Sequence, residues 1–107
     1  MKLDLTNKNI LITGAATGMG RASALEAAKH GANIAIVDIN SEGLKEVSNK
    51  LNSMDANFKS FTMDVTSINE SEKKIEQIEG WFDGGINCLV HFAGALEGSV
   101  VDIDELT

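Results

Sequence analysis

The stretch Asn9-Ile-Leu-Ile-Thr-Gly-Ala-Ala-Thr-Gly-Met-Gly-Arg-Ala-Ser-Ala24 decides the fold of this chain. An apolar run over 10–12 ends at a loop with three glycines, and an alanine-rich helical pattern follows at once. In a strand, turn and helix of this kind, Gly14 allows the turn, Gly18 lets backbone approach a bound group, and Gly20 lets the helix lie close to the sheet. Unpaired N–H groups and the positive end of the helix dipole then face the loop. The stretch predicts a phosphate-binding loop.

Asp38 makes this prediction more specific than the glycines alone, which also occur in purely structural turns. It ends the next apolar run, Ile34–Val37, at the distance of about 20 residues that is typical of a carboxylate binding a ribose. The combination of strand, loop, helix and acidic residue therefore indicates a dinucleotide.

Bulk properties narrow the class of protein. At 107 residues the chain has the length of a single domain, 1–107. Its net charge of −7, without a cluster of Lys or Arg, argues against nucleic acid or an anionic membrane as partner. Cys88 is the only cysteine and lies in an apolar run, which favours a small buried side chain in a reducing compartment. No run approaches the ~20 apolar residues of a membrane span, and no signal-peptide core is present. We expect a cytoplasmic protein, and no metal site is indicated.

The first helix is expected from about residue 19 to residue 30, with Gly31 in the left-handed position that closes a helix. A histidine in a last helical turn, as His30 is, is favoured by the dipole and is usually solvated. The residues expected to face the sheet include Ala22, Leu25 and Ala28.

Strands and helices are expected to alternate through the rest of the chain. Strands are predicted over 34–37, 58–63 and 86–92, with the less apolar 58–63 at the sheet edge. Ser41 is expected to cap the second helix, whose buried residues would be Leu44, Val47 and Leu51. A capping box is expected to start the third helix, formed by Ser67 and Glu70, and its buried stripe would be Ile68, Ile75, Ile78 and Phe82. The tail, 95–107, carries one possible helix start near Asp102.

This order predicts an α/β fold with a doubly wound parallel sheet, in which four strands lie in the order 3-2-1-4 with three helices. The topological switch, and hence the ligand, then falls between the first strand and the fourth. The fourth strand, 86–92, would be an unprotected apolar edge. We therefore expect self-association through it, or pairing with missing C-terminal sequence.

The segment Thr13-Gly-Ala-Ala-Thr-Gly-Met-Gly20 resembles the Thr-Gly-x-x-x-Gly-x-Gly fingerprint of the short-chain dehydrogenases/reductases. Further matching segments follow in order over nearly the whole chain: Arg21-Ala22, Val37-Asp38, Asp64-Val65, Gly85-Ile86 and Leu89-Val-His-Phe-Ala-Gly94. The resemblance implies an oxidoreductase with a Rossmann-like fold, of which this chain is the N-terminal, cofactor-binding portion.

The resemblance also implies which residues contact the cofactor. Asp38 would bind the adenosine ribose, and His91 stands where the family usually has an asparagine, in a structural polar slot at a strand end. The cofactor is expected to be NAD, because a carboxylate repels the 2′-phosphate of NADP and neither Thr17 nor Ile39 supplies a positive charge. The full predicted cofactor set is Gly14, Thr17, Gly18, Met19, Gly20, Asp38, Ile39, Asp64, Val65, His91, Ala93 and Gly94.

The family's catalytic groups, a serine and a Tyr-x-x-x-Lys pair, lie beyond the matching segment, and this chain contains no tyrosine. No catalytic residue is therefore assigned, and the chain alone is expected to be inactive. Two alternatives remain: a non-catalytic nucleotide-binding or regulatory module, and a methyltransferase-like or flavin-binding domain. The second is disfavoured because the first two glycines are four residues apart rather than arranged as Gly-x-Gly-x-Gly.

Overall fold

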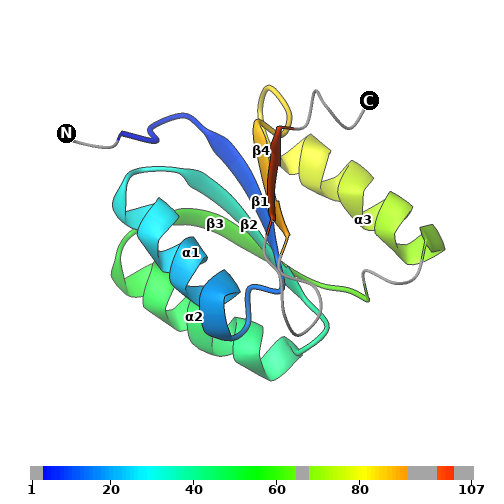
Figure 1. Ribbon diagram of the computed structural model, residues 1–107, viewed down its shortest axis with the longest axis horizontal. Helices are drawn as coiled ribbons and strands as arrows, with labels where there is room; N and C mark the ends of the chain where they lie inside the picture. Colours follow the sequence, from blue (N-terminus) through cyan, green and yellow to red (C-terminus); the bar gives the residue numbers. More distant parts are fainter. Residues whose placement is uncertain (1–3, 65–67, 92–98, 103–107) are drawn as a thin grey trace.

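The computed structural model describes residues 4–64, 68–91 and 99–102. The elements are β1 (Asn9–Thr13), α1 (Gly18–Lys29), β2 (Asn33–Asp38), α2 (Ser41–Ser53), β3 (Asn57–Thr62), α3 (Ile68–Trp81), β4 (Cys88–His91) and β5 (Ser99–Asp102). They form one sheet in the order β3-β2-β1-β4-β5 (Figure 1). The first four of these strands are parallel, which confirms the predicted 3-2-1-4 arrangement with three helices.

Helices cover both faces of the sheet (Figure 1). Alternate residues of β1 and β2 point to opposite faces, so each strand contributes to two cores. One core joins the sheet to α1 and α2, and its buried residues include Ile12, Ile36, Ala24, Val47 and Leu51. The other joins the sheet to α3, and its buried residues include Leu11, Val37, Phe61, Ile78 and Phe82. The continuous apolar runs in β1 and β2 are the consequence of this two-sided burial.

The predicted buried stripe of α2 is confirmed, but those of α1 and α3 need correction. In α1, Leu25 and Ala28 pack against the core as predicted, but Ala22 is exposed. The fully buried positions are Gly20 and Ala24. The close approach of Gly20 to the loop sets the rotation of α1, which turns Ala22 away from the sheet. In α3, Ile78 is buried and Ile75 is 37% exposed. Ile68 and the expected capping box lie outside the side chains that the structure describes.

Asn40, not Ser41, caps the second helix. The Asn40 side-chain oxygen accepts a hydrogen bond from the Gly43 N–H at 3.0 Å, and Ser41 is the first helical residue. Asparagine and serine are comparable caps, so the sequence did not distinguish these neighbouring positions. Gly31 has φ +92°, as expected for the residue that follows α1.

The helix expected to start near Asp102 would run through 103–107, which lie outside the described residues. The residues before them form a fifth strand, β5. It pairs antiparallel with β4, with Cys88 opposite Asp102 and His91 opposite Ser99. β4 is therefore an inner strand, and the expectation that it forms the sheet edge is wrong. Two adjacent valines in β5 favour a strand, and the open hydrogen-bonding groups of β4 provide its partner. The end strands of the sheet are β3, as predicted, and β5.

Three asparagines link the first residues of β1, β2 and β3. Asn57 donates to Asn33 Oδ1 at 2.8 Å, and Asn33 donates to Asn9 Oδ1 at 2.9 Å. The side-chain nitrogen of Asn9 then donates to the backbone oxygens of Asp83, at 3.0 Å, and Gly85, at 2.7 Å. This asparagine ladder fixes the register of three strands and holds the turn that precedes β4.

Replacing Asn9 by Ala should destabilise the fold by about 2–3 kcal/mol, because Asn9 is buried and its loss leaves two backbone oxygens without these partners. The matched variant Asn57→Ala removes one hydrogen bond from an exposed residue and should cost less than about 1 kcal/mol. Urea unfolding of both variants measures the difference, and equal losses would contradict this role of Asn9.

Candidate cofactor site

The glycine-rich loop has the backbone geometry that its sequence predicts. Gly14 and Gly18 have φ values of +68° and +59°, in the left-handed region that favours glycine. At Gly20, a Cβ atom would lie 1.9 Å from the backbone oxygen of Gly14, so α1 can approach the end of β1 only with glycine there. Around Gly18, by contrast, no described atom lies within 4 Å of a Cβ position. The loop is packed closely on its inner side and open on its outer side.

The start of α1 is available to an anion. Thr17 is the N-cap in an extended conformation, its side chain makes no capping hydrogen bond, and the first turn contains no acidic residue. The N–H groups of a helical first turn have no partner within the helix. Thr17, Gly18 and Met19 are exposed, Met19 to 72%. Such an end combines free donors with the positive end of the helix dipole.

Asp38 lies next to this loop at the end of β2. Its Oδ2 accepts a hydrogen bond from the Ala16 N–H at 3.0 Å, and its Oδ1 accepts one from the Asn40 N–H at 3.0 Å. Its backbone oxygen accepts from the Met63 N–H at 3.0 Å, which joins it to the end of β3. Ile39, the next residue, is 67% exposed. The fold therefore brings the predicted ribose-binding carboxylate directly to the predicted phosphate loop.

His91 links the ends of β4 and β1. Its Nδ1 lies 2.6 Å from the hydroxyl oxygen of Thr13, its register partner in β1, and the tautomer decides which atom donates. This hydrogen bond supports the interpretation of His91 as a polar group in a structural slot. Asp64 is half-buried after β3, at the same edge of the sheet. Val65, Ala93 and Gly94 lie outside the described residues.

Four residues around the loop were missed by sequence reasoning: Thr13, Ala16, Asn40 and Gly43. A Cβ atom on Gly43 would lie 2.7 Å from the Ala16 Cβ, so the start of α2 packs against the loop. The spacing of Asn40 and Gly43 is a capping pattern that the sequence does contain. The contact of Gly43 with Ala16 joins residues more than twenty positions apart, and no local pattern could have shown it.

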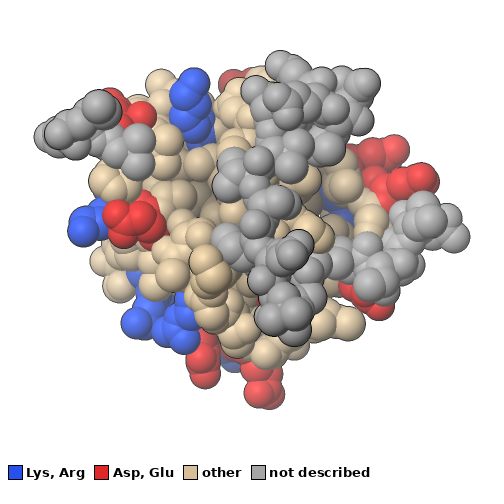
Figure 2. All heavy atoms as spheres, viewed as in Figure 1, with Lys and Arg blue, Asp and Glu red and all other residues tan. Residues whose placement is uncertain are grey.

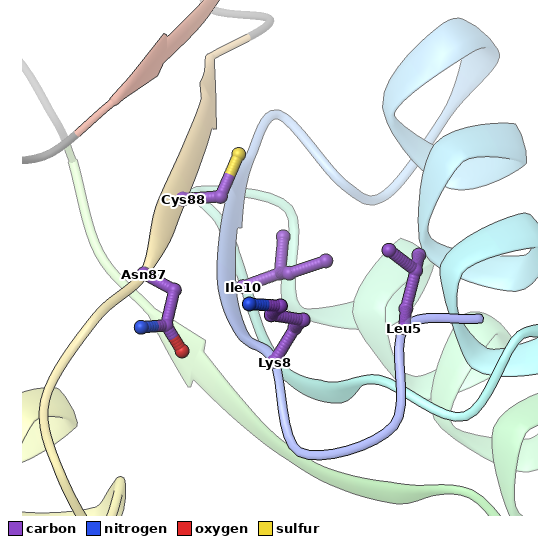
Figure 3. A pocket seen from close by; sticks show the side chains of 5 residues that line it. All are labelled: Leu5, Lys8, Ile10, Asn87 and Cys88. Atoms are coloured by element: carbon purple, nitrogen blue, oxygen red, sulfur yellow. The ribbon is translucent and has the colours of Figure 1, made fainter. Parts of the chain in front are cut away.

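A pocket of about 330 Å³ lies elsewhere, beside the first residues of β1 and β4. Figure 3 shows Leu5, Lys8 and Ile10 on one side of it, with Asn87 and Cys88 on the other. Cys88, expected to be buried, is half-buried. The carboxyl ends of the strands, where the glycine-rich loop and Asp38 lie, are at the opposite end of the sheet. The pocket is therefore separate from the candidate cofactor site.

The distribution of charged side chains over the surface is seen in Figure 2. On the face shown in Figure 2, Lys and Arg are interspersed with Asp and Glu around the rim and form no continuous basic surface among the residues drawn in colour. No helix within the described ranges has both the length and the apolar character required to cross a membrane.

Comparison with known proteins agrees with the geometry. Residues 8–107 match the short chain dehydrogenase family. A tropinone reductase homolog from Arabidopsis thaliana is 36% identical over 94 residues, which cover 88% of this chain and 35% of that protein. The crystal structure of a short-chain type dehydrogenase/reductase from Mycobacterium marinum superposes with a TM-score of 0.81 at 33% identity, covering 88% of this chain and 38% of that one.

A second solved structure is a putative D-mannonate oxidoreductase from Haemophilus influenza with bound NAD. It superposes with a TM-score of 0.74 at 31% identity, over 81% of this chain and 31% of that one. The chain belongs to the short-chain dehydrogenase family. It spans about a third of the length of these relatives.

Two helical glycines offer a matched test of the loop. Gly20→Ala should destabilise the fold by about 3 kcal/mol or more, because its methyl group would overlap the Gly14 backbone oxygen. Gly80→Ala, in α3, should stabilise it by about 0.5 kcal/mol, because its methyl group would meet no described atom within 4 Å and alanine is the better helix former. Thermal unfolding of both variants checks the opposite signs, and equal shifts would refute the close approach at Gly20.

Proposed function

We propose that this chain binds NAD(H) and is the cofactor-binding portion of an oxidoreductase that transfers a hydride between the nicotinamide and an alcohol or carbonyl substrate. The observation that carries the proposal is the Asp38 carboxylate held 3.0 Å from a backbone N–H of the glycine-rich loop. Membership of the short-chain dehydrogenase family supports the oxidoreductase class. NAD bound to the similar oxidoreductase from Haemophilus influenza supports the cofactor.

The start of α1 would hold the pyrophosphate. Free N–H groups in the first helical turn can donate to phosphate oxygens, and the open space over Gly18 lets the cofactor approach the backbone. Exposed Met19 and Ile39 would offer apolar surface to the adenosine half of the cofactor. The nicotinamide half would extend toward the end of β4, where His91 lies.

Asp38 would select NAD over NADP. A carboxylate can accept hydrogen bonds from both ribose hydroxyls, whereas a 2′-phosphate in the same place meets a like charge. Thr17 and Ile39, the two neighbouring positions from which a cation could neutralise that phosphate, are uncharged. Arg21 lies one turn into α1 and is half-buried.

Hydride transfer to a carbonyl also requires a proton donor, which the family supplies with a tyrosine that this chain lacks. The residues present would bind and orient the cofactor, and the nicotinamide would supply the hydride. We further propose a cytoplasmic location, consistent with a single cysteine and an acidic surface without a membrane-spanning helix in the described ranges.

Titration with both dinucleotides tests the cofactor assignment. We expect NAD to bind on the order of 10²-fold more tightly than NADP. The 2′-phosphate of NADP and the Asp38 carboxylate are both negative and would repel each other in a site partly shielded from water. The double variant Asp38→Ala, Ile39→Arg should reverse the preference, while Glu76→Ala, which removes an exposed carboxylate on α3, should leave it unchanged. Equal affinities of the wild-type chain for the two cofactors would refute the assignment.

Activity measurements test whether this chain catalyses hydride transfer without a tyrosine. The purified chain should consume NADH with a ketone no faster than a Gly14→Asp control, whose side chain blocks the loop. A positioned acid or base contributes about 10²–10⁴ in rate, and the chain holds no tyrosine to provide it. Absorbance at the NADH wavelength follows the reaction, and turnover clearly above the control would show that another residue supplies the proton.

A further inference from the structure

We propose that Asp38 is also a positioning residue for the glycine-rich loop, so that one carboxylate holds both the phosphate-binding backbone and the ribose. This inference rests on the proposed function only in naming the loop as the pyrophosphate site. The contact itself, between Asp38 Oδ2 and the Ala16 N–H at 3.0 Å, is present without a cofactor.

Asp38 belongs to a closed circuit of contacts between the loop and the start of α2. Its Oδ2 accepts from Ala16, and its Oδ1 accepts from the Asn40 N–H. Asn40 in turn caps α2 at the Gly43 N–H, and the Gly43 Cα packs against the Ala16 side chain. Asp38 thus orients Asn40, Asn40 orients the first turn of α2, and that turn contacts the loop again at Ala16. The loop is thus held from β2 and α2 as well as by its own glycines.

The burial of Ala16 explains why this contact matters. Ala16 is 2% exposed, and an N–H group in such a position is costly to leave without an acceptor. Asp38 supplies that acceptor across 22 residues of sequence. If the carboxylate is removed, the 14–18 segment loses a tie to β2, and its N–H groups are less well ordered for a phosphate.

The carboxylate has enough acceptor capacity for both tasks. Each carboxylate oxygen can accept two hydrogen bonds, and in this structure one position on each oxygen is taken by a backbone N–H. One position on each oxygen therefore remains for the two hydroxyls of an adenosine ribose. The two backbone donors orient the carboxylate in advance, which reduces the ordering required when a cofactor binds.

The consequence is that ribose selectivity and pyrophosphate affinity are coupled through Asp38. A variant that exchanges Asp38 for a neutral residue to admit NADP should also bind the pyrophosphate less well. If Asp38 contacted only the ribose, the two effects would be separable.

The experiment compares wild type, Asp38→Ala and Asp38→Asn, with Glu76→Ala as the matched loss of an exposed carboxylate. The first measurement is hydrogen exchange of the Ala16 amide by NMR, without cofactor. Asp38→Ala should accelerate this exchange about tenfold, whereas Glu76→Ala should not change it. Unchanged exchange in Asp38→Ala would overturn the proposal.

The second measurement is the affinity for an NAD analogue whose adenosine ribose is 2′,3′-dideoxy and so offers Asp38 no hydroxyl. We expect Asp38→Ala to bind this analogue about fivefold or more weakly than wild type does, because its loop is less ordered. Asp38→Asn should be intermediate, since the two backbone donors bond to separate carboxylate oxygens and asparagine keeps only one of them. Equal affinities of the three proteins would show that Asp38 acts on the ribose alone.

The two measurements separate this inference from the proposed function. Failure of the wild-type chain to bind NAD would refute the proposed function, while the Ala16 exchange measurement would still decide whether Asp38 positions the loop.

Discussion

The close approach of α1 to the end of β1 is the constraint on which the rest of the structure depends. Gly20 lies so near the Gly14 backbone oxygen that a single methyl group would not fit between them. This contact fixes the rotation of α1, which buries Ala24 against the sheet and exposes Ala22. It also directs the first N–H groups of the helix over the loop, where a phosphate would lie. One packing contact therefore sets both a core and a candidate binding site.

The two ends of the parallel sheet are stabilised by different means. At the amino ends of the strands, the asparagine ladder from Asn57 through Asn33 to Asn9 joins side chains to one another and to the turn before β4. At the carboxyl ends, Asp38 leaves acceptor positions open and the first turn of α1 leaves donors open. This asymmetry is expected of an α/β sheet, whose ligands bind at the carboxyl ends of the strands.

Membership of the short-chain dehydrogenase family is consistent with the sheet and the glycine-rich loop that the chain contains. The candidate cofactor residues in the described ranges lie at or after the carboxyl ends of the parallel strands, and the chain covers about a third of the length of its relatives. His91 joins β4 to β1 through its hydrogen bond with Thr13. The imidazole suits this position because each of its nitrogens can serve as donor or acceptor.

The sequence by itself determined the parallel sheet, its strand order and the glycine-rich loop, because these follow from apolar runs, glycine spacing and the rule for right-handed crossovers. It also placed Asp38 at the end of β2. Only the tertiary structure decided which residue capped α2, that Ala22 and Ile75 were exposed, and that 99–102 formed a strand beside β4. Only it brought the Ala16 N–H to the Asp38 carboxylate and Gly43 against the Ala16 side chain. Periodicity reports the local backbone and its buried side, whereas partners distant in sequence are chosen by packing and by the need of each buried polar group for an acceptor or donor.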